Sequence, residues 1–189
     1  MAQKRKDWNG LISGFKASDL VSLDESGCNT DMTRRYAYSL GGSRAVDSAP
    51  LSKPKNTTIL SSIQLDGTLR YTTFSGGTTV ERFKRYLETD LLPHLNGNSV
   101  LIMDNMKSHH AKAVRNLLDS SEIRYIYLPP YSPDLNPIEK LWSKVKAFLR
   151  KFKARTLDAL PNAIQCAFQT VSPSDCSGWF HSCGYSPYF

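Results

Sequence analysis

Short apolar runs, some alternating with polar residues and one nearly continuous, predict the strands of this chain. A Gly, Pro, Asp or Asn residue, which favours a turn, lies at one or both ends of each run. The predicted strands are Leu20–Leu23, Arg35–Leu40, Thr57–Leu65, Thr68–Phe74, Ser99–Met103 and Arg124–Leu128. Asp66-Gly67 suits a tight turn with positive φ and predicts a hairpin between the third and fourth of them. The fifth is almost purely apolar, as expected of a central buried strand.

Helical periodicity predicts the remaining elements. One helix is predicted from a capping box at residues 78–81 to about Leu92, and a second from Ser108, as N-cap, to about Leu118. Three more are predicted at residues 137–152, 157–170 and 173–183. The helix after Asn136 has the strongest signal, with Asn136 as N-cap, Pro137 at N1 and Glu139 at N3. Pro161 counts against the helix at 157–170. Strands followed by strand–helix alternation predict an α/β class with one mixed central sheet flanked by helices.

Length and composition place the chain among ordinary globular proteins. Its 189 residues suggest one domain, and 40% hydrophobic with 22% charged residues are common values. No apolar run approaches the roughly 20 residues that span a bilayer, and no apolar segment follows the basic start, so we expect a cytoplasmic protein. The four cysteines show no C-x-x-C spacing, which favours free thiols over a zinc site.

The excess positive charge lies in one segment. Of the 24 Lys and Arg residues, seven lie in residues 140–155, which hold no acid, and the other 17 balance the 17 acids. These seven are Lys140, Lys144, Lys146, Arg150, Lys151, Lys153 and Arg155. A local basic excess is typical of a surface that binds a polyanion such as a nucleic acid. A solvated helix face is the alternative.

Three acidic residues are candidates for chemistry. Asp24 and Asp104 end apolar runs, and Glu139 lies in the first turn of the strongest helix, with 34 residues between it and Asp104. Three carboxylates on different elements could hold two Mg²⁺ ions, with Mn²⁺ as a substitute, for phosphodiester chemistry. The alternatives are structural, since strand-end Asp often begins a turn and an N3 Glu caps its helix. His109, at a predicted helix start, is expected at the surface.

These residues lie in motifs that resemble bacterial insertion-sequence transposases of the mariner superfamily. The motifs are Leu23-Asp24-Glu25-Ser26-Gly27, Met103-Asp104-Asn105 with His109 downstream, and the block from Leu128 to Glu139 followed by Trp142, with Trp179-Phe180-His181 near the end. The resemblance implies a ribonuclease-H-like fold and an Asp-Asp-Glu triad at Asp24, Asp104 and Glu139. It also implies double-stranded DNA as substrate, with a homodimer assembled on it.

The resemblance begins at about residue 18. We therefore expect residues 1–17 to be a short extension and residues 18–189 to be the catalytic domain, without the helix-turn-helix modules that such transposases carry. A DNA-binding partner or fusion from an upstream frame would supply them. The expected function is metal-dependent DNA cleavage and strand transfer. A structure-selective nuclease of the same fold and a non-catalytic nucleic-acid-binding module are the alternatives.

Overall fold

A five-stranded mixed sheet forms the centre of the computed structural model, which describes residues 2–34, 36–48, 50–51 and 54–185. The strands are β1 (Leu20–Cys28), β2 (Thr57–Gln64), β3 (Leu69–Ser75), β4 (Val100–Met103) and β5 (Arg124–Tyr127), in the order β3-β2-β1-β4-β5. β1, β2 and β3 pair antiparallel, whereas β1, β4 and β5 are parallel. The predicted α/β class and mixed sheet are confirmed.

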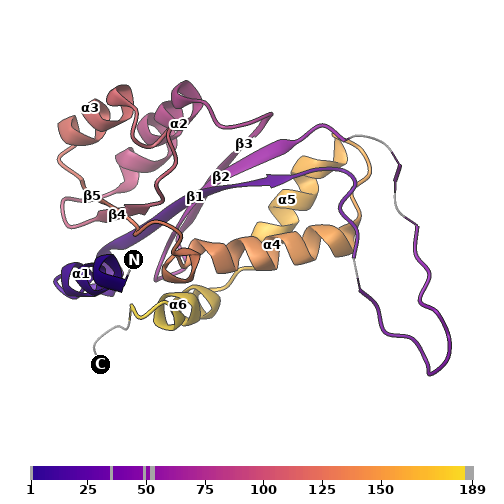
Figure 1. The fold of residues 1–189 in the computed structure, drawn as a ribbon. Helices are drawn as coiled ribbons and strands as arrows, with labels where there is room; N and C mark the ends of the chain where they lie inside the picture. The colour runs from indigo at the N-terminus through magenta and orange to yellow at the C-terminus, as the bar shows by residue number, and fades with distance from the viewer. Residues whose placement is uncertain (1, 35, 49, 52–53, 186–189) are drawn as a thin grey trace.

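Helices cover both faces of this sheet (Figure 1). They are α1 (Ala2–Ile12), α2 (Val80–Tyr86), α3 (Lys112–Ser120), α4 (Ile138–Phe152), α5 (Ala159–Gln169) and α6 (Pro173–Ser182). α2 and α3 lie on one face, and α4, α5 and α6 lie on the other. A five-residue π turn, Leu87–Leu91, continues α2, so the predicted helix reaches about Leu92. No helix among the described residues is long and apolar enough to cross a membrane.

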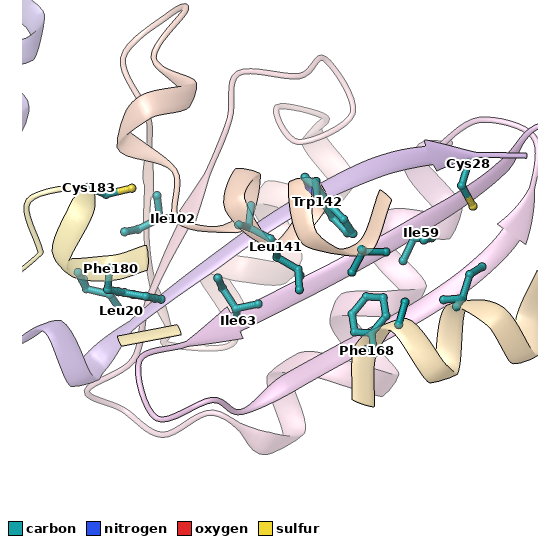
Figure 2. Packing of buried hydrophobic residues seen from close by; sticks show 14 of the residues in the cluster. Leu20, Cys28, Ile59, Ile63, Ile102, Leu141, Trp142, Phe168, Phe180 and Cys183 are labelled. Carbon is teal, nitrogen blue, oxygen red and sulfur yellow. The ribbon is translucent and has the colours of Figure 1, made fainter. Parts of the chain in front are cut away.

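Side-chain alternation along β1 and β4 divides the core into two clusters. Leu20 and Ile102 pack with Leu141, Trp142 and other residues of the α4 side, as Figure 2 shows. Their neighbours along the two strands pack instead with α2 and α3 on the opposite face. Because successive strand residues point to opposite faces, neighbouring polar residues on a strand also point to opposite faces. The two adjacent acidic side chains of β1 therefore point to opposite faces of the sheet.

Three elements differ from the pattern-based prediction. The strand predicted at Arg35–Leu40 is wrong for residues 36–40, which form no strand, while Arg35 lies outside the described residues. Tyr36 and Tyr38 alternate in sequence, yet both sides of β1 are already paired with β2 and β4, and the described part of this segment extends away from the sheet (Figure 1). The helix expected from Ser108 begins only at Lys112, since residues 107–110 form turns.

The third difference is α1, to which the pattern assigned no element. Its Trp8 and Ile12 are buried in the same cluster as the α4 side of the sheet. A helix with a mostly polar sequence carries little amphipathic signal, and here two apolar side chains supply the contact. In α5, Pro161 falls in the first turn, where its missing N–H has no helical partner to lose, so the predicted helix forms.

Candidate active site

Asp24 and Asp104 lie side by side at one edge of the sheet. The parallel pairing of β1 and β4 ends where Ser22 lies opposite Ile102. Asp24 lies two residues beyond Ser22, and Asp104 lies two residues beyond Ile102. Adjacent strands are about 4.8 Å apart, so this register brings the two aspartates close together. β1 continues to Cys28 because it remains paired with β2, so Asp24 lies within the strand and not at its end as predicted.

Glu139 is exposed in the first turn of α4, but the capping box predicted around it is wrong. Within the part of the chain that the structure describes, no side chain caps the N-terminus of α4, and Pro137 occupies the N-cap position. The side chain of Asn136 instead accepts a hydrogen bond from the Ser22 hydroxyl, and both residues are buried. A buried hydroxyl on the strand is costly without an acceptor, which explains why Asn136 serves the strand and not the helix end.

Trp142 makes a second polar contact between α4 and β1. Its indole N–H donates to Oδ2 of Asp24 at 3.0 Å, with only 8% of Asp24 exposed to solvent. Trp142 lies one helical turn beyond Glu139 and is itself buried in the core (Figure 2). The same helix therefore carries one acidic residue of the site and supports another. The sequence pattern assigned Trp142 to the apolar stripe and gave no sign of this second role.

An open cavity of about 450 Å³ lies between Asp104 and Glu139. Its wall is the proline-rich loop of residues 128–133, which is stiff because three of its six residues are prolines. Tyr131, in this loop, has a φ of 56° and its side chain is 89% exposed. A site with two carboxylates on one side and a rigid loop on the other can admit an extended polar substrate.

Electrostatic repulsion acts among the three acidic side chains. Burial, helped by the charges of Asp104 and Glu25, raises the pKa of Asp24 to about 7, although hydrogen bonds from the Glu25 amide and from Trp142 oppose the shift. Burial also raises the pKa of Glu139, and repulsion from Asp104 adds to it, whereas Lys146 lowers it. The site therefore holds more negative charge than its own cations neutralise, an arrangement that a bound cation would relieve.

Asp104 has a cationic partner that the sequence analysis placed wrongly. His109 is completely buried and not at the surface, and its Nδ1 lies 2.9 Å from Oδ1 of Asp104. Its Nε2 lies 3.1 Å from Oε2 of Glu25. Burial would raise the pKa of Asp104, but the bonds from His109 and from the Met106 amide lower it overall. Burial likewise opposes the charge of His109, yet its two carboxylate partners raise its pKa to about 9.

The donor chemistry of this edge fits hard divalent cations. Among the described residues, no three His, Cys, Asp or Glu side chains are grouped closely enough to hold a metal ion as they stand. The three candidate ligands nevertheless offer only carboxylate oxygens, the donors that Mg²⁺ and Mn²⁺ prefer. The exposed side chain of Glu139 is also free of ion-pair partners among the described residues, so it can turn towards Asp104.

The predicted DNA-binding segment separates into engaged and available cations. Lys144 pairs with Asp175 at 2.5 Å and Lys153 with Asp47 at 2.6 Å, while Arg155 donates to two backbone carbonyls. In contrast, Arg150 and Lys151 line an open groove of about 770 Å³ on the outer side of α4. The same groove is lined by Lys144, Arg34, Tyr36 and Phe148.

The strand order is that of the ribonuclease-H-like fold, with antiparallel strands on one side of β1 and parallel strands on the other. The profile of the DDE superfamily endonuclease family matches residues 19–161, and the chain belongs to that family. The matched range contains all three candidate carboxylates.

Similar proteins include a curated relative, the transposable element Tc1 transposase of Caenorhabditis elegans. It is 28% identical over 97 residues, which are 49% of this chain and 36% of that protein. The Mos1 transposase paired-end complex with left transposon end has a TM-score of 0.80 at 19% identity, over 95% of this chain and 57% of that one. The Mos1 transposase catalytic domain with Raltegravir and Mg has a TM-score of 0.71 at 17% identity, over 98% and 94%. The chain thus spans about a third of the Tc1 protein.

Proposed function

We propose that this chain is the catalytic part of a DNA transposase that cleaves a phosphodiester at an element end and joins the freed end to target DNA. The observation that carries the proposal is the register of β1 and β4, which brings Asp24 close to Asp104, together with the charge of Asp104, which adds to burial in raising the pKa of Glu139 on α4. Membership in the DDE superfamily endonucleases supports the same chemistry.

In this proposal Asp24, Asp104 and Glu139 are the catalytic and metal-binding residues. The cofactor is two Mg²⁺ ions, for which Mn²⁺ substitutes, and both metals accompany the Mos1 catalytic domain in solved structures. Bound here, such ions would stabilise the charge on the attacking and leaving oxygens of the phosphodiester. Trp142 holds the carboxylate of Asp24 in place, and the proline-rich loop bounds the space in which the strand lies.

The proposed substrate is double-stranded DNA held along α4. Lys146 lies near enough to Glu139 to lower its pKa, and Arg150 and Lys151 line the groove beyond it. Because Lys and Arg contacts to phosphates give affinity but little base discrimination, end recognition would come from another module, as a fusion or separate partner. A homodimer on DNA, origin in a bacterial insertion sequence and a cytoplasmic, nucleoid-associated location belong to the same proposal.

Substitution of the three carboxylates tests the catalytic assignment. Asp24→Asn, Asp104→Asn and Glu139→Gln should each abolish Mn²⁺-dependent nicking of supercoiled plasmid, because each removes a metal ligand without removing core packing. Glu88→Gln is the matched control, since Glu88 is a surface residue paired with Lys84 on the other face of the sheet and should retain full activity. Wild-type nicking by any of the three site variants would exclude that residue.

Two further measurements separate the proposal from its alternatives. Calorimetric titration of the chain with Mn²⁺ should show binding that Asp104→Asn weakens at least tenfold, a result that a non-catalytic DNA-binding module would not give. Incubation of plasmid with an oligonucleotide that has a free 3′-hydroxyl end should yield joined products. Nicking without any joining would identify a nuclease of the same fold.

A further inference from the structure

Three side chains in contact, those of Glu25, His109 and Asp104, connect β1 to the turn after β4. Glu25 and Asp104 hold the His109 ring between them, with both ring nitrogens within 3.1 Å of a carboxylate oxygen. A ring nitrogen that carries a proton donates to the carboxylate beside it, and the ring lies as a bridge between the two acids. The accessible fractions of the side chains are 0% for His109 and 8% for Glu25, against 45% for Asp104. The bridge therefore begins in the interior and ends at the site.

The ring cannot turn freely in this position. Its face stacks on Phe83 of α2 with ring centroids 4.2 Å apart. Its backbone carbonyl accepts a hydrogen bond of 3.0 Å from the Tyr127 hydroxyl on β5. His109 is thus held by α2, by β5 and, through Glu25, by β1. His109 in turn holds the carboxylate of Asp104.

The two oxygens of Asp104 have different surroundings. Oδ1 accepts from His109 at 2.9 Å and from the Met106 amide at 2.9 Å. None of the described residues donates to Oδ2. With Oδ1 held by two donors, the carboxylate has one orientation, and Oδ2 is the oxygen left for an external ligand.

We propose that His109, held by Glu25, is a positioning residue that fixes Asp104 so that Oδ2 is presented to the metal. The inference rests on the proposed function, in which Asp104 is a metal ligand, and extends it to two residues that contact neither metal nor DNA. Hydrogen bonds of this kind behind a ligating group commonly change metal affinity by 10- to 100-fold when they are removed. Glu25 acts one step further back, by holding the ring.

Two substitutions of His109 separate its two contacts. In His109→Asn the side-chain amide can donate from about the position of Nδ1, so Asp104 keeps its donor and Glu25 loses one. In His109→Gln the amide reaches about the position of Nε2, so Glu25 keeps its donor and Asp104 loses one. The Mn²⁺ affinity of the DNA-free chain should fall at least tenfold in the Gln variant and stay within about threefold of wild type in the Asn variant.

The melting temperature in chelator should show the opposite order. The Asn variant should melt lower than the Gln variant, because it leaves the carboxylate of Glu25 buried without a donor, and one oxygen of that carboxylate already has no partner among the described residues. A purely structural role for His109 predicts that metal affinity and stability fall together in both variants. Equal metal affinities in two folded variants would overturn the proposal.

A metal-free measurement keeps this result distinct from failure of the proposed function. In ¹H–¹⁵N spectra of the wild-type chain, both ring N–H groups of His109 should be protected from exchange. Asp104→Asn should shift chiefly the Nδ1–H signal, and Glu25→Gln chiefly the Nε2–H signal. If this pattern appears but wild type binds no Mn²⁺, the metal assignment fails while the bridge stands. Ring N–H exchange as fast as in a free histidine, or no shift of a ring N–H signal in either variant, would disprove the bridge itself.

Discussion

Asp24→Asn should stabilise the metal-free chain at alkaline pH, although it removes a residue that the proposed reaction needs. Burial raises the pKa of Asp24 from 3.8 to about 7, so the folded chain holds this proton more tightly than the unfolded chain does. The resulting stability is fully present below the unfolded pKa and is lost as the pH rises through about 7. Above that pH the wild-type chain carries a buried charge close to Asp104 and Glu25.

The magnitude follows from the width of this pH window. At 1.36 kcal/mol per pH unit, the free energy of unfolding of wild type should fall by about 2–3 kcal/mol between pH 5 and pH 8 from this group alone. The Asn variant lacks the term and can still accept the Trp142 hydrogen bond through its amide oxygen. The difference in stability between variant and wild type should therefore grow by the same amount, about 2–3 kcal/mol, over the same range.

Urea unfolding in EDTA at pH 5, 6, 7 and 8, followed by circular dichroism, measures this difference. Asp175→Asn is the control of opposite sign, because Lys144 and the Ser172 cap lower the pKa of Asp175 to about 2. Its contribution is lost only as the pH falls through about 2, so that variant should be less stable than wild type by a constant amount from pH 5 to pH 8. Parallel curves for wild type and Asp24→Asn would refute the reasoning. Excess Mg²⁺ at pH 8 should stabilise wild type and not this variant.

Two other predictions concern α4. Trp142→Phe should lower the free energy of unfolding at pH 8 by about 2–3 kcal/mol, because it removes a hydrogen bond to a buried carboxylate. Urea titration should show a smaller loss for Trp8→Phe, since the buried indole of Trp8 contacts no carboxylate among the described residues. Replacing Lys146 and Lys151 by alanine should reduce the slope of log DNA affinity against log salt by at most about two. Lys153→Ala should leave that slope nearly unchanged, since Lys153 pairs with a carboxylate of the chain. Equal slopes for all variants in a fluorescence anisotropy titration would contradict this assignment.

Most elements of the fold could be predicted because burial on a sheet or helix imposes a short period on the sequence. The apolar run at Val100–Met103 and the stripe of α4 are local patterns, and both elements formed where they were expected. The alternation at residues 36–40 did not produce a strand, since β1, the strand before it in the chain, is paired on both sides with β2 and β4. That pairing is a property of the assembled sheet, which no local pattern contains.

The residues of the candidate site were likewise only partly predictable from local sequence patterns. Asp104 and Glu139 could be found because each lies next to a strong local element, and the register of β1 and β4 then places Asp24 beside Asp104. The groups that hold these carboxylates could not be found, because their contacts join distant parts of the chain. His109 and Glu25 are 84 residues apart, and Trp142 and Asp24 are 118 apart. A histidine five residues after Asp104 carries no signal that it will be buried.

The failed capping box at α4 shows how the fold places Glu139 while leaving it free. Asn136 and Trp142 lie three residues before and three residues after Glu139, and both bond to polar side chains on the same face of β1, Ser22 and Asp24. Two buried hydrogen bonds therefore fix the first turns of α4 against the strand that carries Asp24. An N-terminal cap would have engaged the carboxylate of Glu139 with its own helix. Because the tie to β1 replaces the cap, the helix is held by its neighbours and the Glu139 carboxylate remains available to a ligand outside the protein.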